Sequence, residues 1–84
     1  MGKHEKLLEK ILQGRSDTNI GFDELRKLLE RLGFEHRQRG SHRIFRKAGV
    51  EEKINLQEDA GHAKPYQMGQ VRGILLRYRL TEIR

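Results

Sequence analysis

Apolar side chains recur every three or four residues in three stretches of the chain, the spacing that places them on one face of a helix. These stretches are residues 3 to 13, 22 to 32 and about 67 to 80. Gly21 is the expected N-cap of the second helix, and Gly33 stands where a left-handed residue would end it. The pattern therefore predicts two amphipathic helices in the first part of the chain and one near its end.

Between the second and third helices the apolar period shortens to two residues, which is typical of β-strands. The expected strands are residues 34 to 39, 42 to 47 and 53 to 57. The Gly40-Ser41 pair is typical of a tight turn between the first two strands. Residues 58 to 64 are expected to form a loop that leads to the last helix.

This order of elements predicts an α+β fold, with an α-β-β-β-α domain over residues 21 to 80. Its three-stranded antiparallel sheet carries both helices on one face and leaves the other face free. Residues 1 to 20 form an N-terminal helical extension, and residues 81 to 84 a short tail. Because so short a helix is marginal by itself in water, its apolar stripe is expected to pack on the domain or on a second copy. That stripe consists of Leu7, Leu8, Ile11 and Leu12.

The composition narrows the class of protein. A chain of 84 residues supports one small core, and without cysteine it holds neither a disulfide framework nor a thiolate zinc site. No apolar run has the length of a membrane span, about 18 residues, and the first residues do not read as a signal peptide. We therefore expect a soluble protein of the cytoplasm without a membrane partner.

The net charge of +6 is unevenly distributed along the chain. Residues 36 to 47 carry five Lys or Arg and no acid, and residues 64 to 84 carry five against one acid. A basic surplus held in two segments of a folded chain indicates a surface for a polyanion, with nucleic acid the first candidate. A merely soluble basic domain would have the same total charge.

The segment "RQRGSHRIFRK", residues 37 to 47, surrounds a Gly-Ser-His turn with five cationic side chains. Arg39 and Arg43 flank His42, and a guanidinium group binds phosphate through two parallel N–H groups. Gly40 allows a nucleic-acid backbone to come close, and the Ser41 hydroxyl can donate to a phosphate oxygen. The candidate phosphate-binding residues are Arg37, Arg39, Gly40, Ser41, Arg43, Arg46, Lys47 and Lys64.

Alternation along the second strand divides its side chains between the two faces of the sheet. His42 and Ile44 point to one face, and Arg43 and Phe45 point to the other. One of the two apolar residues must therefore lie away from the helices, and the sequence pattern does not indicate which. His42 reaches the surface in either case because it adjoins the turn.

Four stretches, in this order, resemble the small toxins of the HicA family: "FDELRKLLERLGFE", "HRQRGSHRIFRK", "KINLQ" and "KPYQMGQVRGILLRY". The resemblance covers about residues 21 to 80, and its most specific part is the "GSH" step followed by an apolar pair. It implies a fold similar to the double-stranded RNA-binding domain and ribonuclease activity on messenger RNA. It also implies a co-encoded HicB antitoxin that covers the active site, and it places the family's single essential histidine at His42.

Two features depart from the family pattern. Members commonly begin at the helix expected over residues 22 to 32, so the resemblance supplies no role for residues 1 to 20. The stretch "EDAGHAKPYQ" is more acidic than the basic, Gly-rich loop often found there, which puts a phosphate contact from this stretch in doubt.

Strand cleavage of RNA needs only proton transfer, in-line geometry and stabilisation of the transition-state charge, because RNA carries its own nucleophile in the 2′-OH. A histidine can take the 2′-OH proton, or give one to the leaving 5′-oxygen, near neutral pH. The resulting prediction is a metal-independent endoribonuclease with His42 as general base or acid. This chemistry needs no cofactor.

Other functions are compatible with the same residues. A non-catalytic RNA-binding module would recognise duplex shape and 2′-hydroxyls with this basic surface, and His42 would then only contact phosphate. A protein-interaction subunit would pair the basic surface with an acidic partner, and a charged outward strand face would also hinder edge pairing. A monomer and a dimer fit the sequence equally well.

The remaining histidines and the tyrosines are weaker candidates. His4, His36 and His62 fall in three elements and lack metal-ligand spacing, so no metal site is expected. Tyr78 lies on the apolar stripe of the last helix and is expected in the core. Tyr66, just before that helix, is the better candidate for stacking on a base.

Overall fold

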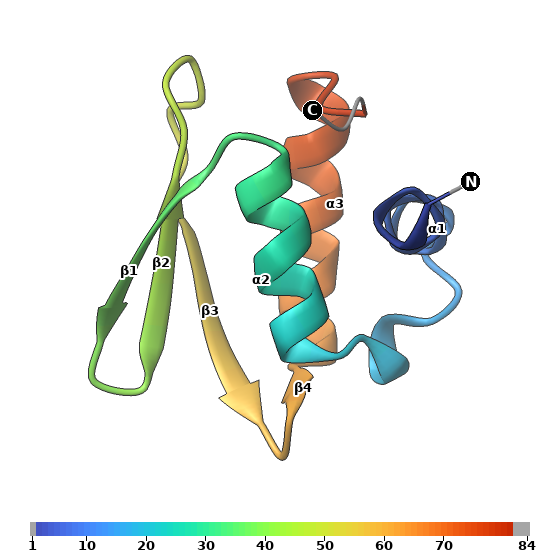
Figure 1. Ribbon diagram of the computed structural model, residues 1–84, viewed down its shortest axis with the longest axis horizontal. Coiled ribbons are helices and arrows are strands. Elements are labelled where there is room, and N and C mark those ends of the chain that lie inside the picture. The colour runs from blue at the N-terminus through green and yellow to red at the C-terminus, as the bar shows by residue number, and fades with distance from the viewer. Residues whose placement is uncertain (1, 82–84) are drawn as a thin grey trace.

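Three α-helices, one 3-10 turn and a four-stranded antiparallel sheet make up the part of the chain that the computed structural model describes, residues 2–81 (Figure 1). The helical elements are α1 (Lys3–Gln13), η1 (Asp17–Asn19), α2 (Phe22–Arg31) and α3 (Pro65–Arg77). The strands are β1 (Glu35–Arg39), β2 (His42–Arg46), β3 (Ile54–Asp59) and β4 (His62–Ala63). Of the predicted tail, residues 82–84 lie outside the described part.

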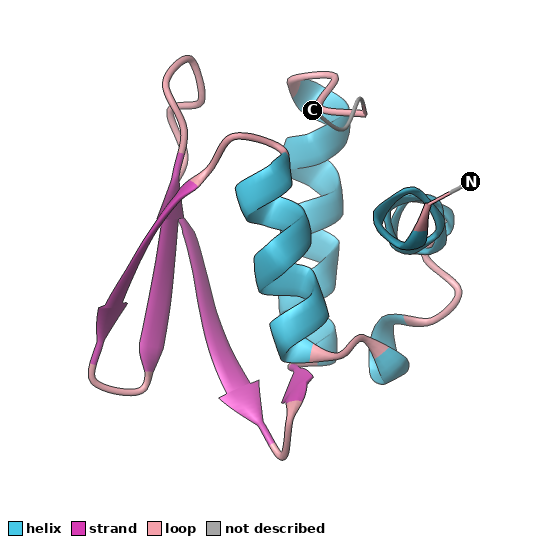
Figure 2. Cartoon of the chain, in the orientation of Figure 1, coloured by secondary structure: helices cyan, strands magenta, loops and turns pink. Residues whose placement is uncertain are grey.

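The elements form three layers. The sheet has the order β1-β2-β3-β4, and each strand runs antiparallel to its neighbours. Helices α2 and α3 cover one face of this sheet, and α1 lies on the far side of the two helices (Figures 1 and 2). The predicted α+β arrangement, with both helices of the α-β-β-β-α domain on one face, is confirmed.

The core fills the space between the sheet and the helices and extends to α1. It is closed from the sheet side by Phe45, Ile54 and Leu56, whose side chains are fully buried. The helices contribute Leu8, Ile11, Leu25, Leu28, Leu29, Met68, Val71 and Leu75. Strand residues at alternate positions thus face the helices, and within residues 2–81 no element covers the other face of the sheet.

The first part of the chain packs on the rest of the same domain. Leu8 and Ile11 of α1 are buried, and Leu7 and Leu12 are partly buried against the same core. The Arg72 guanidinium on α3 donates to the Asp17 carboxylate at 2.6 Å and to the backbone carbonyl of Ile11 at 3.3 Å. Of the two places expected for this apolar stripe, the domain itself is the one that the structure shows.

The glycine expected at the end of the second helix has the predicted role. Gly33 is left-handed, with φ of 99°. Its N–H donates to the carbonyl of Glu30, and the N–H of Phe34 donates to the carbonyl of Leu29. These two bonds form a Schellman motif, and Phe34 returns to the core as its apolar partner.

The last helix begins and ends earlier than the apolar pattern indicates. It starts at Pro65 because proline suits the first helical position, where its missing N–H costs no hydrogen bond. It ends at Arg77 because Arg79 takes a left-handed conformation, with φ of 54°. The N–H of Leu80 then donates to the carbonyl of Leu75, so a second Schellman motif closes this helix without a glycine.

The prediction of a loop over residues 58 to 64 is wrong. Strand β3 continues to Asp59, and the turn at Ala60-Gly61, where φ is 52° and 83°, returns the chain as β4. Positive φ at both central residues belongs to the tight hairpin turn that suits the twist of the strands. Strand β4 then pairs with the segment before α2, because the N–H of Ala63 donates to the carbonyl of Ile20.

Candidate functional site

The open face of the sheet carries His42. Phe45 of β2 is fully buried under the helices, so the alternating positions His42 and Ile44 point away from them. The histidine is exposed, and Ile44 is half-buried on the same face. The structure thereby decides which of the two apolar residues of β2 enters the core.

Strand register places polar side chains on both sides of His42. Arg39 of β1 and Gln57 of β3 are its direct cross-strand partners. Side chains at directly paired positions share a face and have Cβ atoms about 5 Å apart. The neighbouring row, Arg37, Ile44 and Asn55, lies on the same face. An arginine is therefore the direct cross-strand neighbour of His42 on β1.

One ring nitrogen of His42 already has a partner. Its Nδ1 lies 3.1 Å from Oδ1 of Asn55, which is a hydrogen-bond distance. Within residues 2–81 no side chain hydrogen-bonds the other ring nitrogen, Nε2. Since the histidine is exposed on the open face, Nε2 is accessible to a ligand.

Lys64 reaches the row of His42 from the start of α3. It is the N-cap residue of that helix, and its Nζ donates to Oε1 of Gln57 at 3.0 Å. The backbone N–H of Gln57 donates to the buried side chain of Gln67, at the point of β3 where its pairing with β4 ends. These two contacts hold the start of α3, and with it the Lys64 ammonium, beside the site.

The turn between β1 and β2 leaves the end of the site open. Gly40 has φ of 58°, the left-handed conformation that a tight turn requires here. A Cβ built at Gly40 would meet no atom within 4 Å, and Ser41 is exposed. The space next to Gly40 is therefore open to solvent at the end of the row that holds His42.

Arg43 does not share a surface with His42. Its guanidinium carbon lies 5.6 Å from the centre of the Phe22 ring, on the helix side of the sheet. At that distance the cation interacts with the face of the ring. The expected pair of arginines around His42 is therefore divided between the two faces, and only Arg39 lies beside the imidazole.

The other predicted cations lie farther along the sheet. Arg46 ends β2 and is paired with Glu35, four positions from His42, which corresponds to about 13 Å along a strand. Lys47 follows the strand, and its Nζ lies close to Gly33. The structure thus brings Arg37, Arg39, Gly40, Ser41 and Lys64 to the site of His42 and leaves Arg46 and Lys47 at the opposite end of β2.

His36 and His62, the other two histidines of the sheet, each have contacts away from His42. The His36 ring stacks on Phe45 with centroids 4.7 Å apart, on the helix side of the sheet. The Nδ1 of His62 lies 3.1 Å from the carbonyl of Ala60 in the hairpin turn. Among residues 2–81, no group of three His, Cys, Asp or Glu side chains has the geometry to hold a metal ion.

No helix within residues 2–81 is long and apolar enough to cross a membrane.

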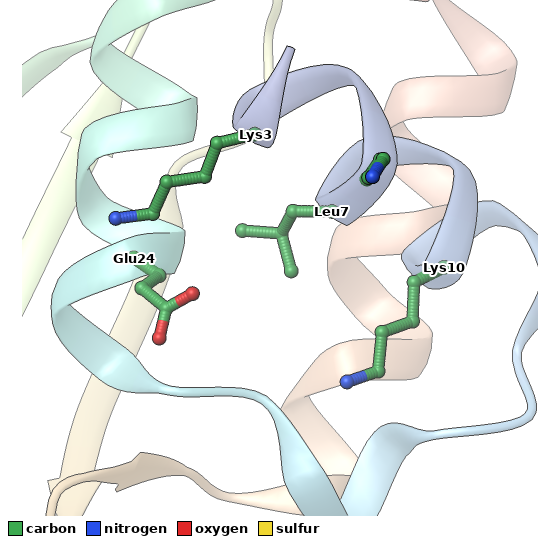
Figure 3. Close-up of a pocket in the computed structure, with 5 residues that line it drawn as sticks. Lys3, Leu7, Lys10 and Glu24 are labelled. Carbon is green, nitrogen blue, oxygen red and sulfur yellow. The ribbon is translucent and has the colours of Figure 1, made fainter. Parts of the chain in front are cut away.

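A hollow of about 460 Å³ lies outside this site, between α1 and α2 (Figure 3). It is lined by Lys3, Lys6, Leu7, Lys10 and Glu24. Because α1 lies beyond the helix layer, this hollow is on the opposite side of the molecule from His42 (Figure 1). Its walls hold ammonium groups and one carboxylate, without a histidine that could act as a base near neutral pH.

Sequence reasoning missed two residues of the site, Asn55 and Gln57. Both occupy the polar positions of β3, whose apolar residues Ile54 and Leu56 are fully buried. The alternation places the two polar residues on the other face. Their position beside His42 follows only from the pairing of β2 with β3, which the sequence pattern does not specify.

Comparison with known proteins identifies one family. A family model described as "HicA toxin of bacterial toxin-antitoxin" matches residues 22–78. No curated protein and no solved structure matches the chain. The matched segment runs from the start of α2 to just past the end of α3, so it contains the whole site around His42 and leaves α1 outside.

Proposed function

The chain belongs to the HicA family of bacterial toxins, and we propose that it is a metal-independent endoribonuclease that cuts messenger RNA with His42 as its acid–base group. Membership of the family implies an antitoxin partner. We propose a HicB-type antitoxin that covers the open sheet face, and the cytoplasm as the place where both act.

The observation that carries this proposal is the position of His42. Its imidazole is exposed on the open face, has a free Nε2 within the described residues 2–81, and lies directly opposite Arg39. A base and a phosphate-binding cation in adjacent positions are the two groups that cleavage of RNA by its own 2′-OH requires. No other histidine of residues 2–81 has a cationic cross-strand partner on this face.

The reaction is balanced by proton transfers alone. The 2′-oxygen attacks phosphorus, the bond from phosphorus to the 5′-oxygen breaks, and a 2′,3′-cyclic phosphate and a 5′-hydroxyl form. As general base, His42 takes the 2′-OH proton while water protonates the leaving 5′-oxygen; as general acid, it protonates that oxygen while water takes the 2′-OH proton. Since the nucleophile belongs to the RNA, the chemistry requires neither a metal-bound water nor a covalent enzyme intermediate.

The surrounding residues bind the phosphate and stabilise its charge. Arg39 offers two parallel N–H donors to the reacting phosphate, and Lys64 adds a compact charge from the other side of the row. Gly40 leaves room for the RNA backbone, and the Ser41 hydroxyl can donate to a phosphate oxygen. We assign Arg37, Arg46 and Lys47 to flanking phosphates. Arg43, whose guanidinium lies over the Phe22 ring on the helix side of the sheet, takes no part in this surface.

The test is cleavage of an end-labelled RNA in EDTA by the wild-type chain and by His42→Ala. We expect the wild type to cut and His42→Ala to lose at least about 100-fold in rate, the usual contribution of a general acid or base. His62→Ala is the matched control, because His62 is also exposed but lies on β4. A substrate with 2′-deoxyribose at the cleaved position should resist the wild type.

Two results would contradict the proposal. Full activity of His42→Ala, with circular dichroism showing a folded protein, would remove His42 from the chemistry. Tight RNA binding by the wild type without any cleavage would instead favour the non-catalytic RNA-binding module.

A further inference from the structure

The contact between His42 and Asn55 joins two strands. Asn55 lies on β3 in the row next to that of His42, on the same open face. Its Oδ1 is 3.1 Å from Nδ1 of the histidine. Both backbones are held by strand pairing, so the two side chains extend from a rigid sheet and not from a loop.

Gln57 cannot replace Asn55 in this contact. It is the direct cross-strand partner of His42, but its Oε1 accepts a hydrogen bond from Lys64 at 3.0 Å. Its backbone N–H is held by Gln67. The diagonal neighbour Asn55 is therefore the residue of β3 whose amide oxygen is directed to the imidazole.

The chemistry of the two atoms determines which ring nitrogen carries the hydrogen. An amide oxygen only accepts hydrogen bonds, so the contact requires a hydrogen on Nδ1. In the neutral ring the other nitrogen, Nε2, then has the lone pair. Free histidine prefers the opposite tautomer, with the hydrogen on Nε2, and that form would present a donor where a base is needed.

We infer that Asn55 is a positioning residue that holds neutral His42 in its Nδ1–H tautomer and directs the Nε2 lone pair to the substrate. The tautomer itself follows from the contact in the free protein. Its effect on cleavage rests on the proposed ribonuclease function, in which Nε2 takes the 2′-OH proton. After that transfer both ring nitrogens carry hydrogen, and Asn55 continues to accept from Nδ1.

The first test is independent of RNA. In the ¹⁵N-labelled protein, at a pH at which the ring is neutral, a long-range ¹H–¹⁵N spectrum separates the two tautomers of His42. We expect mainly the Nδ1–H form in the wild type and a shift toward the Nε2–H form in Asn55→Ala. An Nε2–H ring in the wild type, or a tautomer unchanged in Asn55→Ala, would overturn the inference.

The second test measures the rate. We expect Asn55→Ala to lower kcat roughly three- to tenfold with KM nearly unchanged, the size of one exposed neutral hydrogen bond that acts in the reaction. Asn55→Asp restores the acceptor, so it should recover the rate and move the acid limb of the pH–rate profile to higher pH. Asn19→Ala changes the other asparagine of the chain, which is exposed on η1, and should leave kcat and the pH–rate profile unchanged.

The two tests separate this inference from the proposed function. If the wild type cuts RNA, His42→Ala does not, and Asn55→Ala behaves as the wild type in rate and pH profile, the inference fails and the function stands. If the wild type does not cut RNA, the proposed function fails, and the tautomer seen by NMR decides the inference alone.

Discussion

Tyr66 is the most exposed of the large hydrophobic side chains of residues 2–81, at 73%. It lies in the first turn of α3, two positions after Lys64, and its hydroxyl accepts a weak hydrogen bond from Gln67 at 3.5 Å. Gln67 in turn holds the backbone of Gln57, the cross-strand partner of His42. An exposed aromatic ring offers a face on which an unpaired base can stack.

We predict that Tyr66→Ala weakens binding of a single-stranded RNA by about 1–3 kcal/mol, the usual value for one stacked base. Tyr66→Phe keeps the ring and should bind as the wild type does. The measurement is fluorescence anisotropy with a labelled oligonucleotide, in the His42→Ala background so that the RNA stays intact. Equal losses in the Ala and Phe variants would show that the hydroxyl matters and that stacking does not.

The connection between β2 and β3 is tied to the end of α3 by one carboxylate. Glu52 accepts hydrogen bonds from the Tyr78 hydroxyl and, at 3.1 Å, from the Arg77 guanidinium. The bond from Tyr78 lowers the pKa of the Glu52 carboxyl, and the same bond raises the pKa of Tyr78. Helix α3 is thereby linked to the β2–β3 hairpin, and β2 is the strand that carries His42.

The lowered pKa of Glu52 predicts how the stability of the fold varies with pH. Because the pKa of Glu52 in the folded protein lies below its ordinary value of 4.5, the stabilisation is present above about pH 4.5 and is lost as the pH falls through the folded value. We therefore expect Tyr78→Phe to lower the melting temperature at pH 7, and this difference from the wild type to shrink below pH 4. Thermal unfolding by circular dichroism from pH 3 to 7 measures it, and a difference constant over that range would contradict the linkage.

At the scale of the whole molecule, α1 belongs to the same core as the sheet and the other helices. Ile11 is fully buried, and the carbonyl of the same residue accepts from Arg72 on α3. The ion pair between Arg72 and Asp17 at 2.6 Å is mostly shielded from solvent. The segment before residue 20 therefore contributes to the stability of the fold, although it lies outside the segment that matches the family.

We predict that Ile11→Ala destabilises the whole domain by about 2–5 kcal/mol, because it leaves a cavity between α1 and the other helices. Leu7→Ala, at a half-buried position of the same helix, should cost clearly less. Urea unfolding followed by circular dichroism measures both. Similar small effects in the two variants would indicate that α1 unfolds separately from the sheet.

Local patterns were sufficient for much of the fold and for part of the site. Helix and strand periods predicted every element except η1 and β4. The periods are informative because a helix or strand buries the side chains of one face, which recur at a fixed spacing in the sequence. Gly33 was recognised as a helix end because glycine, which has no Cβ, adopts a positive φ without steric cost. The bounds of α3 were less accurate, since the left-handed Arg79 has no sequence signal comparable to glycine.

The sequence by itself determined the order of the elements, the basic segment around His42 and the resemblance that named this histidine. Only the tertiary structure decided which face of β2 is open. Alternation places Ile44 and Phe45 on opposite faces but does not say which face is buried, and in the structure Phe45 enters the core. That choice separated Arg43 from His42. Register then brought Asn55, thirteen positions away along the chain, to the imidazole, because strand pairing joins residues whose distance in sequence carries no information about their contact.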